Sequence, residues 1–178
     1  MDESDLMRQV SRGDREAFAA LVEIHTPALE RFAMRMLLER QRAEEVLQET
    51  LMKAWREAAR YDPDRGRLST WLHQIAHNLC IDILRRQRRE QPLTENADTI
   101  FGSEESPETV LQTRETQRQV TMAVSALSQR HRTALILTYY QSLPNRDVAQ
   151  IMDISLRALE SLLARARREL KTILEEST

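Results

Sequence analysis

Apolar side chains recur at intervals of three and four residues along most of this chain, and this period constrains the fold more than any other feature of the sequence. Side chains spaced in this way lie along one face of an α-helix, whereas a half-buried strand needs strict alternation. The 178 residues include only 3 glycines and 5 prolines, fewer turn-forming residues than a sheet protein would need. The sequence therefore predicts an all-α fold of amphipathic helices.

One acidic stretch interrupts the helical period and divides the chain in two. Residues 91–112 contain acidic side chains but no lysine or arginine, together with two prolines and one glycine. Because they lack a sustained apolar stripe, they are predicted to form a flexible linker. The chain is thus expected to comprise an N-terminal helical bundle over residues 1–90 and a C-terminal four-helix domain over residues 113–178, each long enough to fold alone.

Short signals in the sequence place several helix boundaries. Gly13 suits the end of a short helix over residues 5–12, and the side chain of Asp14 can cap the next helix. Pro27 is predicted to bend or split that second helix. After the linker, a helix over residues 113–126 is expected, then a cap at Ser128.

The composition does not indicate a metal site, a disulfide, a signal peptide or a membrane-spanning helix. Cys80 is the only cysteine, and no cysteine or histidine spacing is typical of a zinc site, so neither a disulfide, a metal nor another cofactor is expected. The N-terminus lacks the basic start and apolar core of a signal peptide, and no apolar run approaches the roughly 18 residues of a membrane helix. We expect a cytoplasmic protein with no membrane insertion of its own.

The segment over residues 43–58 has two faces. Its apolar face consists of Val46, Leu47, Leu51, Ala54, Trp55 and Ala58. Its other face consists of Glu45, Gln48, Glu49, Met52 and Lys53. This second face is either solvated, as charged faces commonly are, or a row of acceptors for a basic partner surface.

The segment over residues 69–89 also has two faces and follows a loop with proline and glycine. Ser69 or Thr70 is expected to cap its helix. The side chains expected to be buried are Leu72, Ile75, Ala76, Leu79 and Ile83. The polar stripe consists of Trp71, Gln74, Asn78, Asp82, Arg85 and Arg89.

This polar stripe has the chemistry of a surface for melted DNA. Aromatic rings stack on bases, amides bind their edges and guanidinium groups hold phosphates. Taken alone, the pattern is better explained by an ordinary helix with a half-buried tryptophan and solvated arginines near its C-terminal end. His73 and His77 fall outside both stripes, so we expect them at the surface or half-buried and assign them no role.

Residues 144–170 have the spacing of a helix-turn-helix, although a plain helical hairpin would share much of it. The side chains expected to pack inward are Val148, Ala149, Met152, Ile154, Leu159 and Leu162. Asp153 stands at the turn, where glycine is usual, and aspartate tolerates the left-handed conformation better than most residues. A helix-turn-helix lays its second helix in the major groove of DNA.

Two other classes of function fit less of the sequence. An enzyme would need a nucleophile, an acid/base pair or a glycine-rich phosphate loop, and the sequence has no motif of these kinds. A helix-turn-helix repressor or activator that acts through this motif alone would account for the C-terminal half only. The polar faces of residues 43–58 and 69–89 would have no use in such a protein.

Four segments taken together resemble the extracytoplasmic-function (group IV) sigma factors of bacterial RNA polymerase. They are GDREAFAALVE at 13–23, AEEVLQETLMKAW at 43–55, STWLHQIAHNLCIDILRRQRR at 69–89 and the helix-turn-helix, in the family's order and across nearly the whole chain. The resemblance implies an initiation factor that binds core polymerase and makes no chemical bond. Its N-terminal domain would bind and open the promoter -10 element, and its C-terminal domain would bind the -35 element.

The resemblance also implies contacts for individual residues. The surface that docks on the clamp helices of the largest polymerase subunit would consist of Glu45, Gln48, Glu49, Met52 and Lys53. Asn78 matches the position that holds a flipped -10 base, in a pocket walled by the loop over residues 64–69. The other -10 candidates are Arg65, Arg67, Trp71, Gln74, Arg85, Arg86, Arg88 and Arg89. The -35 candidates are Arg146, Ser155, Arg157, Ala158, Ser161, Arg165 and Arg168.

Further implications concern specificity and control. Glu160 and Leu162 stand where relatives commonly carry a basic residue and an arginine, so the relatives' -35 preference does not transfer to this chain. The acidic linker resembles a segment that threads through the polymerase, although its composition fits a simple spacer equally well. The C-terminal domain would also meet the flap of the second-largest subunit. An anti-sigma factor is the further partner that the resemblance implies.

Overall fold

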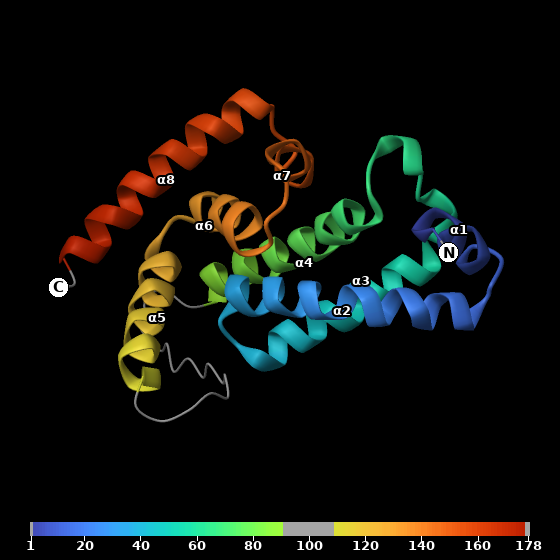
Figure 1. The fold of residues 1–178 in the computed structure, drawn as a ribbon, viewed down its shortest axis with the longest axis horizontal. Coiled ribbons are helices and arrows are strands. Elements are labelled where there is room, and N and C mark those ends of the chain that lie inside the picture. The colour runs from blue at the N-terminus through green and yellow to red at the C-terminus, as the bar shows by residue number, and fades with distance from the viewer. Residues whose placement is uncertain (1, 91–108, 177–178) are drawn as a thin grey trace.

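The computed structural model describes residues 2–90 and 109–176, and every regular element in those residues is helical. The α-helices are α1 (Glu3–Val10), α2 (Arg15–Leu37), α3 (Arg40–Arg56), α4 (Leu68–Glu90), α5 (Thr109–Ala126), α6 (Gln129–Leu135), α7 (Asn145–Ile151) and α8 (Leu156–Glu176). Three short helices join them, namely the 3-10 helices η1 (Ala58–Arg60) and η2 (Pro63–Arg65) and the π-helix η3 (Ile136–Tyr140). The predicted all-α fold is confirmed (Figure 1), while residues 91–108 of the predicted linker lie outside the described residues.

The N-terminal half is a bundle of α2, α3 and α4, with α1 packed at one end (Figure 1). Its core forms around Leu29, Phe32 and Met36 of α2, all of which are fully buried. Val46 of α3 and Ala76 of α4 pack into the same core. Since one face of each helix is buried here, the opposite faces of α3 and α4 are left to solvent.

The boundary between α1 and α2 follows the sequence prediction. Gly13 has a φ of +89°, a conformation that glycine adopts without strain. The Asp14 carboxylate accepts hydrogen bonds from the backbone N–H groups of Glu16 (2.9 Å) and Ala17 (3.1 Å). It thereby satisfies two of the donors that the first turn of α2 leaves free.

Pro27 does not split α2, which runs without interruption from Arg15 to Leu37. A proline inside a helix costs about 3 kcal/mol, because it removes one backbone donor and crowds the preceding turn. Leu21 before it and Leu29 after it are both buried in the bundle core. Burying each such side chain contributes about 1.5–3 kcal/mol, which offsets the cost of the proline.

Helix α4 begins at Leu68, so the prediction that Ser69 or Thr70 caps it is wrong. Leu68 is almost fully buried, so the first turn of α4 packs into the core and the helix begins before the residues that the capping pattern indicates. Thr70 is buried as well, and its hydroxyl donates to Asp147 of α7 (3.2 Å). Tertiary contacts therefore override the local signal here.

The C-terminal half contains the predicted helices, with two differences. Helix α5 begins at Thr109 rather than at residue 113, so the end of the predicted linker is helical. The expected cap at Ser128 is confirmed, since its hydroxyl accepts from the N–H of His131 (3.3 Å). The next helix continues as the π-helix η3, whose wider turn the apolar period does not indicate.

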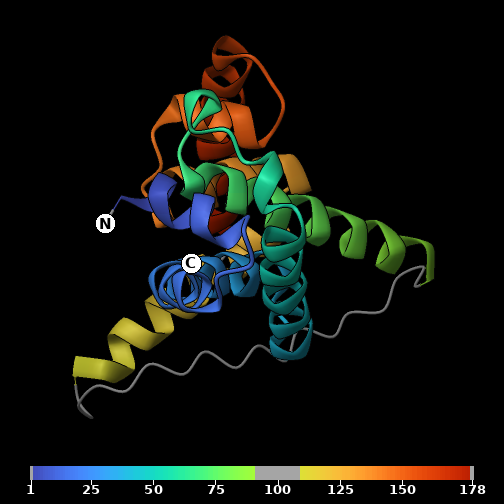
Figure 2. The same cartoon turned by 90° about the vertical axis from the view of Figure 1, so that its right-hand side faces the viewer.

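The two halves share one continuous core, although the sequence predicted two bodies joined only by a linker. Helix α7 lies against α4, and η3 lies against α2 (Figure 2). Arg132 of α6 donates to the carbonyl oxygen of Met36 at the end of α2 (3.1 Å) and to that of Ser125. Arg35 of α2 lies 4.4 Å from the ring centre of Tyr140 in a cation–π contact.

In the part of the chain that the structure covers, no helix is both long enough and apolar enough to cross a bilayer.

Removing the cap of α2 should destabilise the bundle measurably. Asp14→Ala is expected to lower the free energy of unfolding by about 1 kcal/mol, because two backbone donors lose their acceptor. For a chain of this length that corresponds to a fall in Tm of about 2–4 °C in a thermal melt. Asp2→Ala is the matched control, because Asp2 precedes α1 but its side chain makes no capping hydrogen bond. Equal losses for the two variants would contradict the capping role.

Candidate nucleic-acid interface

The outward face of α3 is polar, as predicted. Glu45, Gln48 and Met52 are exposed, and the Met52 side chain is unusually open for an apolar residue, with 45% of its surface accessible. Glu49 and Lys53 are half-buried. The opposite face is held in the core, where the fully buried Thr50 donates to the carbonyl oxygen of Val46 (2.7 Å).

The buried side of α4 differs in part from the prediction. Leu72 and Ala76 are buried, whereas Ile75, Leu79 and Ile83 are only half-buried. Cys80 and His73 complete the buried stripe, with 0% and 2% of their surfaces exposed. The buried stripe of α4 therefore includes His73 and Cys80 in place of the predicted Ile75, Leu79 and Ile83. Helices α2, α3 and α7 all pack against α4.

Asn78 stands on the exposed face of α4, opposite this buried stripe. Four arginines follow it on the exposed surface of the last two turns, namely Arg85, Arg86, Arg88 and Arg89. Figure 2 shows that this end of α4 extends away from the bundle. An amide and a run of guanidinium groups are thus available to one ligand along a single helix.

Of the other predicted members of this polar face, Trp71 and Gln74 are half-buried, whereas Asp82 is exposed and lies 3.8 Å from Arg85. The Trp71 ring packs against the core and lies 5.7 Å from the ring of Tyr61, centre to centre. Tyr61 in turn donates to the carbonyl oxygen of Gly66 (3.2 Å). Part of the Trp71 ring is therefore taken up by contacts within the domain, and these contacts anchor the loop before α4.

The α3–α4 loop, residues 57–67, carries the exposed Arg65 and Arg67. The Asp62 carboxylate caps the 3-10 helix η2 in this loop by accepting from the N–H of Asp64 (3.0 Å). The loop also touches the C-terminal half, because Gln150 of α7 donates to the carbonyl oxygen of Arg65 (3.1 Å). The structure thus brings part of the predicted -10 surface against the helix-turn-helix, which nothing in the sequence pattern indicates.

The helix-turn-helix geometry of α7 and α8 is as predicted. Asp153 has a φ of +53°, the left-handed conformation expected at the turn. Ala149 and Leu159 are buried where the two helices cross, and Ile154 is half-buried in the turn. Leu162 was predicted to pack inward but is only half-buried; Leu163 takes the buried position, because α6 covers α8 from that side.

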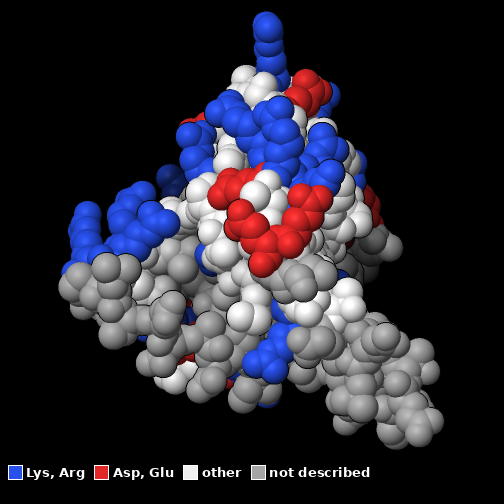
Figure 3. Space-filling model, turned by 90° about the vertical axis from the view of Figure 1, so that its left-hand side faces the viewer, with Lys and Arg blue, Asp and Glu red and all other residues white. Residues whose placement is uncertain are grey.

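All seven predicted -35 residues are exposed: Arg146, Ser155, Arg157, Ala158, Ser161, Arg165 and Arg168. Four of them, Arg157, Ser161, Arg165 and Arg168, follow one another at helical spacing along α8. Figure 3 shows basic side chains gathered over the face along which α8 runs. The Ser155 hydroxyl already accepts from the N–H of Ala158 (3.1 Å), so Ser155 also caps α8.

Three histidines are at least partly withdrawn from solvent. His73 was predicted to lie at the surface or half-buried, and this prediction is wrong. Its ring donates from Nδ1 to the carbonyl oxygen of Ser69 (2.7 Å) and packs edge-on against Phe32. Burial lowers the pKa of His73 and of the half-buried His77. Burial also lowers the pKa of His25, although Glu3 lies 3.2 Å from its Nε2 and opposes the shift.

No group of histidine, cysteine, aspartate and glutamate side chains in residues 2–90 and 109–176 is arranged to hold a metal ion. The Cys80 thiol is fully buried, and burial raises its pKa to about 12.

The sequence matches two family descriptions: Sigma-70 region 2 over residues 21–90 and Sigma-70, region 4 over residues 117–170. It is 28% identical over 179 residues to the ECF RNA polymerase sigma factor SigW of Bacillus subtilis (strain 168), across 96% of this chain and 95% of that protein. It is 32% identical over 145 residues to the ECF RNA polymerase sigma factor SigM of the same organism, across 80% of this chain and 86% of that protein.

The fold is similar to two solved structures. One is CnrH in complex with the cytosolic domain of CnrY, with a TM-score of 0.76 and 23% identity across 99% of both chains. The other is the sigma factor RpoE in complex with the anti-sigma factor NepR from Bartonella quintana, with a TM-score of 0.74 and 25% identity across 89% of this chain and 96% of that chain. The region 2 and region 4 matches fall on α2–α4 and α5–α8.

The buried histidines should make stability depend on pH. Their pKa values lie below the ordinary value near 6.5, so the unfolded chain binds more protons below that pH. The contribution of the neutral histidines to the free energy of unfolding is fully present above about pH 6.5. It is lost as the pH falls below about 6.5 and through the lowered pKa values of the folded protein. Unfolding of the wild type in urea should therefore require less denaturant at pH 5.5 than at pH 7.5.

The matched comparison is His73→Gln, which keeps a side-chain donor for Ser69 but cannot be protonated. The variant should lose less stability than the wild type between the two pH values, by up to about 1.4 kcal/mol per pH unit for one proton. The same pH dependence in both proteins would show that His73 does not contribute to it.

Proposed function

The chain belongs to the extracytoplasmic-function sigma factors, and from this membership we propose how its exposed surfaces divide the work of transcription initiation. As a sigma factor it directs RNA polymerase to promoters and is not an enzyme. The Sigma-70 region 2 match covers the N-terminal half. A repressor or activator that consists of a helix-turn-helix alone would not contain this region, so that alternative is excluded. The division of labour rests on one observation: helices α3, α4 and α8 each bury an apolar stripe and leave a different chemistry exposed.

The face of α3 binds the polymerase. Glu45, Gln48 and Glu49 offer acceptors, and Lys53 adds a donor on the same side. The exposed Met52 provides an apolar centre for this surface, a composition typical of interfaces. Its partner is the pair of clamp helices of the largest polymerase subunit, which must be basic opposite Glu45 and Glu49.

The face of α4 and its preceding loop bind the -10 element. Asn78 reads a flipped base with its amide, and the arginines from Arg85 to Arg89 hold the neighbouring phosphates. Arg65 and Arg67 wall the pocket from the loop. The half-buried Trp71 and Gln74 act mainly by shaping the surface, since little of either side chain is available for stacking.

The exposed face of α8 binds the -35 element. Arg157 and Ser161 lie in the first turns, where a recognition helix meets base edges, and Arg165 and Arg168 follow along the phosphates. Arg146 of α7 adds a phosphate contact from the first helix. Glu160 is exposed in the same stretch and would accept from a cytosine amino group or repel phosphate, which makes the -35 preference particular to this chain.

Two further proposals concern partners. The acidic residues 91–108, which lie outside the described residues, would pass through a basic channel of the polymerase, while region 4 meets the flap of the second-largest subunit. RpoE of Bartonella quintana was solved with an anti-sigma factor, and this chain has a similar fold. We propose an anti-sigma factor as its partner in the inactive state.

Run-off transcription tests the proposed function directly. Purified core polymerase with this chain should transcribe from a subset of upstream regions in a genomic library, and core alone should not. The chain should also co-elute with core in gel filtration. Neither promoter-specific transcripts nor co-elution would overturn the proposal.

The -10 assignment is tested by Asn78→Ala on a promoter found in that assay. Promoter opening, measured by permanganate reactivity of unpaired thymines, should fall by about five- to a hundredfold, because one base contact contributes about 1–3 kcal/mol. Co-elution with core should be unchanged. The variant Glu45→Ala/Gln48→Ala is the reciprocal control, and it should weaken co-elution. Loss of co-elution or of folding by Asn78→Ala would show that the pocket is wrongly placed.

A further inference from the structure

Two methionines in residues 2–90 and 109–176 are exposed to solvent. Met52 of α3 is 45% exposed and Met122 of α5 is 55% exposed. The other described methionines are buried or half-buried: Met7, Met34, Met36 and Met152. The Cys80 thiol is buried as well. An oxidant in solution therefore meets sulfur at Met52 and Met122 first, since access limits the oxidation of a thioether.

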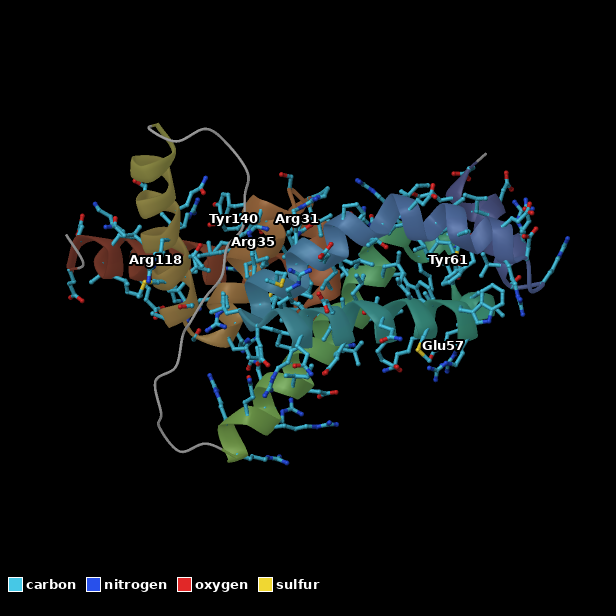
Figure 4. All side chains as sticks on the ribbon, turned by 90° about the horizontal axis from the view of Figure 1, so that it is seen from below. Arg31, Arg35, Glu57, Tyr61, Arg118 and Tyr140 are labelled. Atoms are coloured by element: carbon cyan, nitrogen blue, oxygen red, sulfur yellow. The ribbon has the colours of Figure 1, made fainter. Side chains whose placement is uncertain are left out.

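Met52 lies within the polar face of α3. Gln48 and Glu49 precede it by one turn and Arg56 follows it by one turn, so these side chains are its neighbours on the helix surface. The Glu49 carboxylate and the Arg56 guanidinium are 3.7 Å apart, and this ion pair runs across the turn that carries Met52. Figure 4 shows side chains of α3 pointing away from α2 on the side where Glu57 is labelled. An exposed apolar side chain is thus framed by polar groups.

This arrangement is typical of the centre of a protein interface. Polar groups around an apolar side chain exclude water from it once a partner is bound. Under the proposed function, the clamp helices of the polymerase cover this face of α3, and Glu45 and Glu49 meet their basic groups. Met52 then lies against an apolar patch of the partner and loses its remaining contact with water.

Oxidation replaces this apolar centre with a strong hydrogen-bond acceptor. The sulfur lone pair attacks one oxygen of hydrogen peroxide, the O–O bond breaks, and the leaving hydroxide takes the proton of the transferred oxygen to form water. The thioether is oxidised to a sulfoxide and the peroxide is reduced, with no other reactant. An apolar partner surface offers the sulfoxide oxygen no donor, so the oxygen loses its hydrogen bonds to water on binding.

We propose that oxidation of Met52 to the sulfoxide weakens the binding of this chain to the polymerase. The proposal rests on the proposed function, because that function places Met52 in the polymerase contact. Reduction restores the thioether: the two methionine sulfoxide reductases, one for each sulfoxide epimer, use a pair of thiols that end as a disulfide, and the sulfoxide oxygen leaves as water. A chain already bound to the polymerase is protected, because the partner covers the sulfur.

The first test maps oxidation along the full chain. The protein is treated with hydrogen peroxide, with and without saturating core polymerase, and peptide mass spectrometry follows the gain of one oxygen at each methionine. Met52 and Met122 should be oxidised before Met7 and Met36, and core should slow the oxidation of Met52. Oxidation of Met36 before Met52, or equal rates at Met52 with and without core, would contradict the proposal.

The second test measures affinity for core polymerase before and after peroxide treatment. The proteins are the wild type, Met52→Leu and Met122→Leu, since leucine is close to methionine in volume but cannot be oxidised. Each protein is compared with its own untreated form, so any effect of the leucine itself cancels. Oxidation should weaken binding by about five- to a hundredfold in the wild type and in the control Met122→Leu, the penalty of one buried acceptor without a donor. The affinity of Met52→Leu should not change on oxidation.

Reversal guards against damage by peroxide elsewhere in the chain. Treatment of the oxidised wild type with both reductases should restore its affinity, and circular dichroism should show the same helix content before and after oxidation. Full affinity in a wild type converted at Met52, or an equal loss in oxidised Met52→Leu, would overturn this proposal alone. Failure of the untreated wild type to bind core would instead refute the proposed function, and the proposal for Met52 with it.

Discussion

Burial of one face of α2 is the interaction on which the remaining structure depends. Leu29, Phe32 and Met36 are fully buried, and side chains of this size each contribute about 1.5–3 kcal/mol. Phe32 packs against the His73 ring of α4, and Met36 touches the C-terminal half through Thr133. Because α3, α4 and η3 all pack on this helix, its apolar stripe determines which of their faces are left for ligands.

The sequence predicts well those features that depend on neighbouring residues. The cap at Asp14 and the left-handed turn at Asp153 are local, and each needs only a few residues around it. The burial of Val46 and Ala54 in α3 and the exposure of Asn78 in α4 follow from the apolar period of a single helix, whereas Leu47, Leu51 and Trp55 of the predicted apolar face are only half-buried. These features account for most of the proposed interface, which is why family membership and the exposed faces of these helices were predictable.

Features that depend on packing between distant segments were not predictable. Thr70 and Asp147 stand 77 residues apart, and neither carries a local signal of the hydrogen bond between them. His73 lies on the buried side of α4 and packs against Phe32 of α2, a contact that the apolar period of α4 alone does not indicate. The choice of Leu163 over Leu162 depends on the side from which α6 approaches, since neighbouring positions on a helix differ by only about 100° in direction.

The burial of Cys80 has a consequence for the signals to which this factor can respond. A thiol reacts with oxidants as its thiolate, and a pKa of about 12 with no exposed surface leaves almost none at neutral pH. Cys80 is also the sole cysteine of the chain. If transcription under its control changes with the redox state of the cell, oxidation of a thiol in this chain is not the sensing reaction.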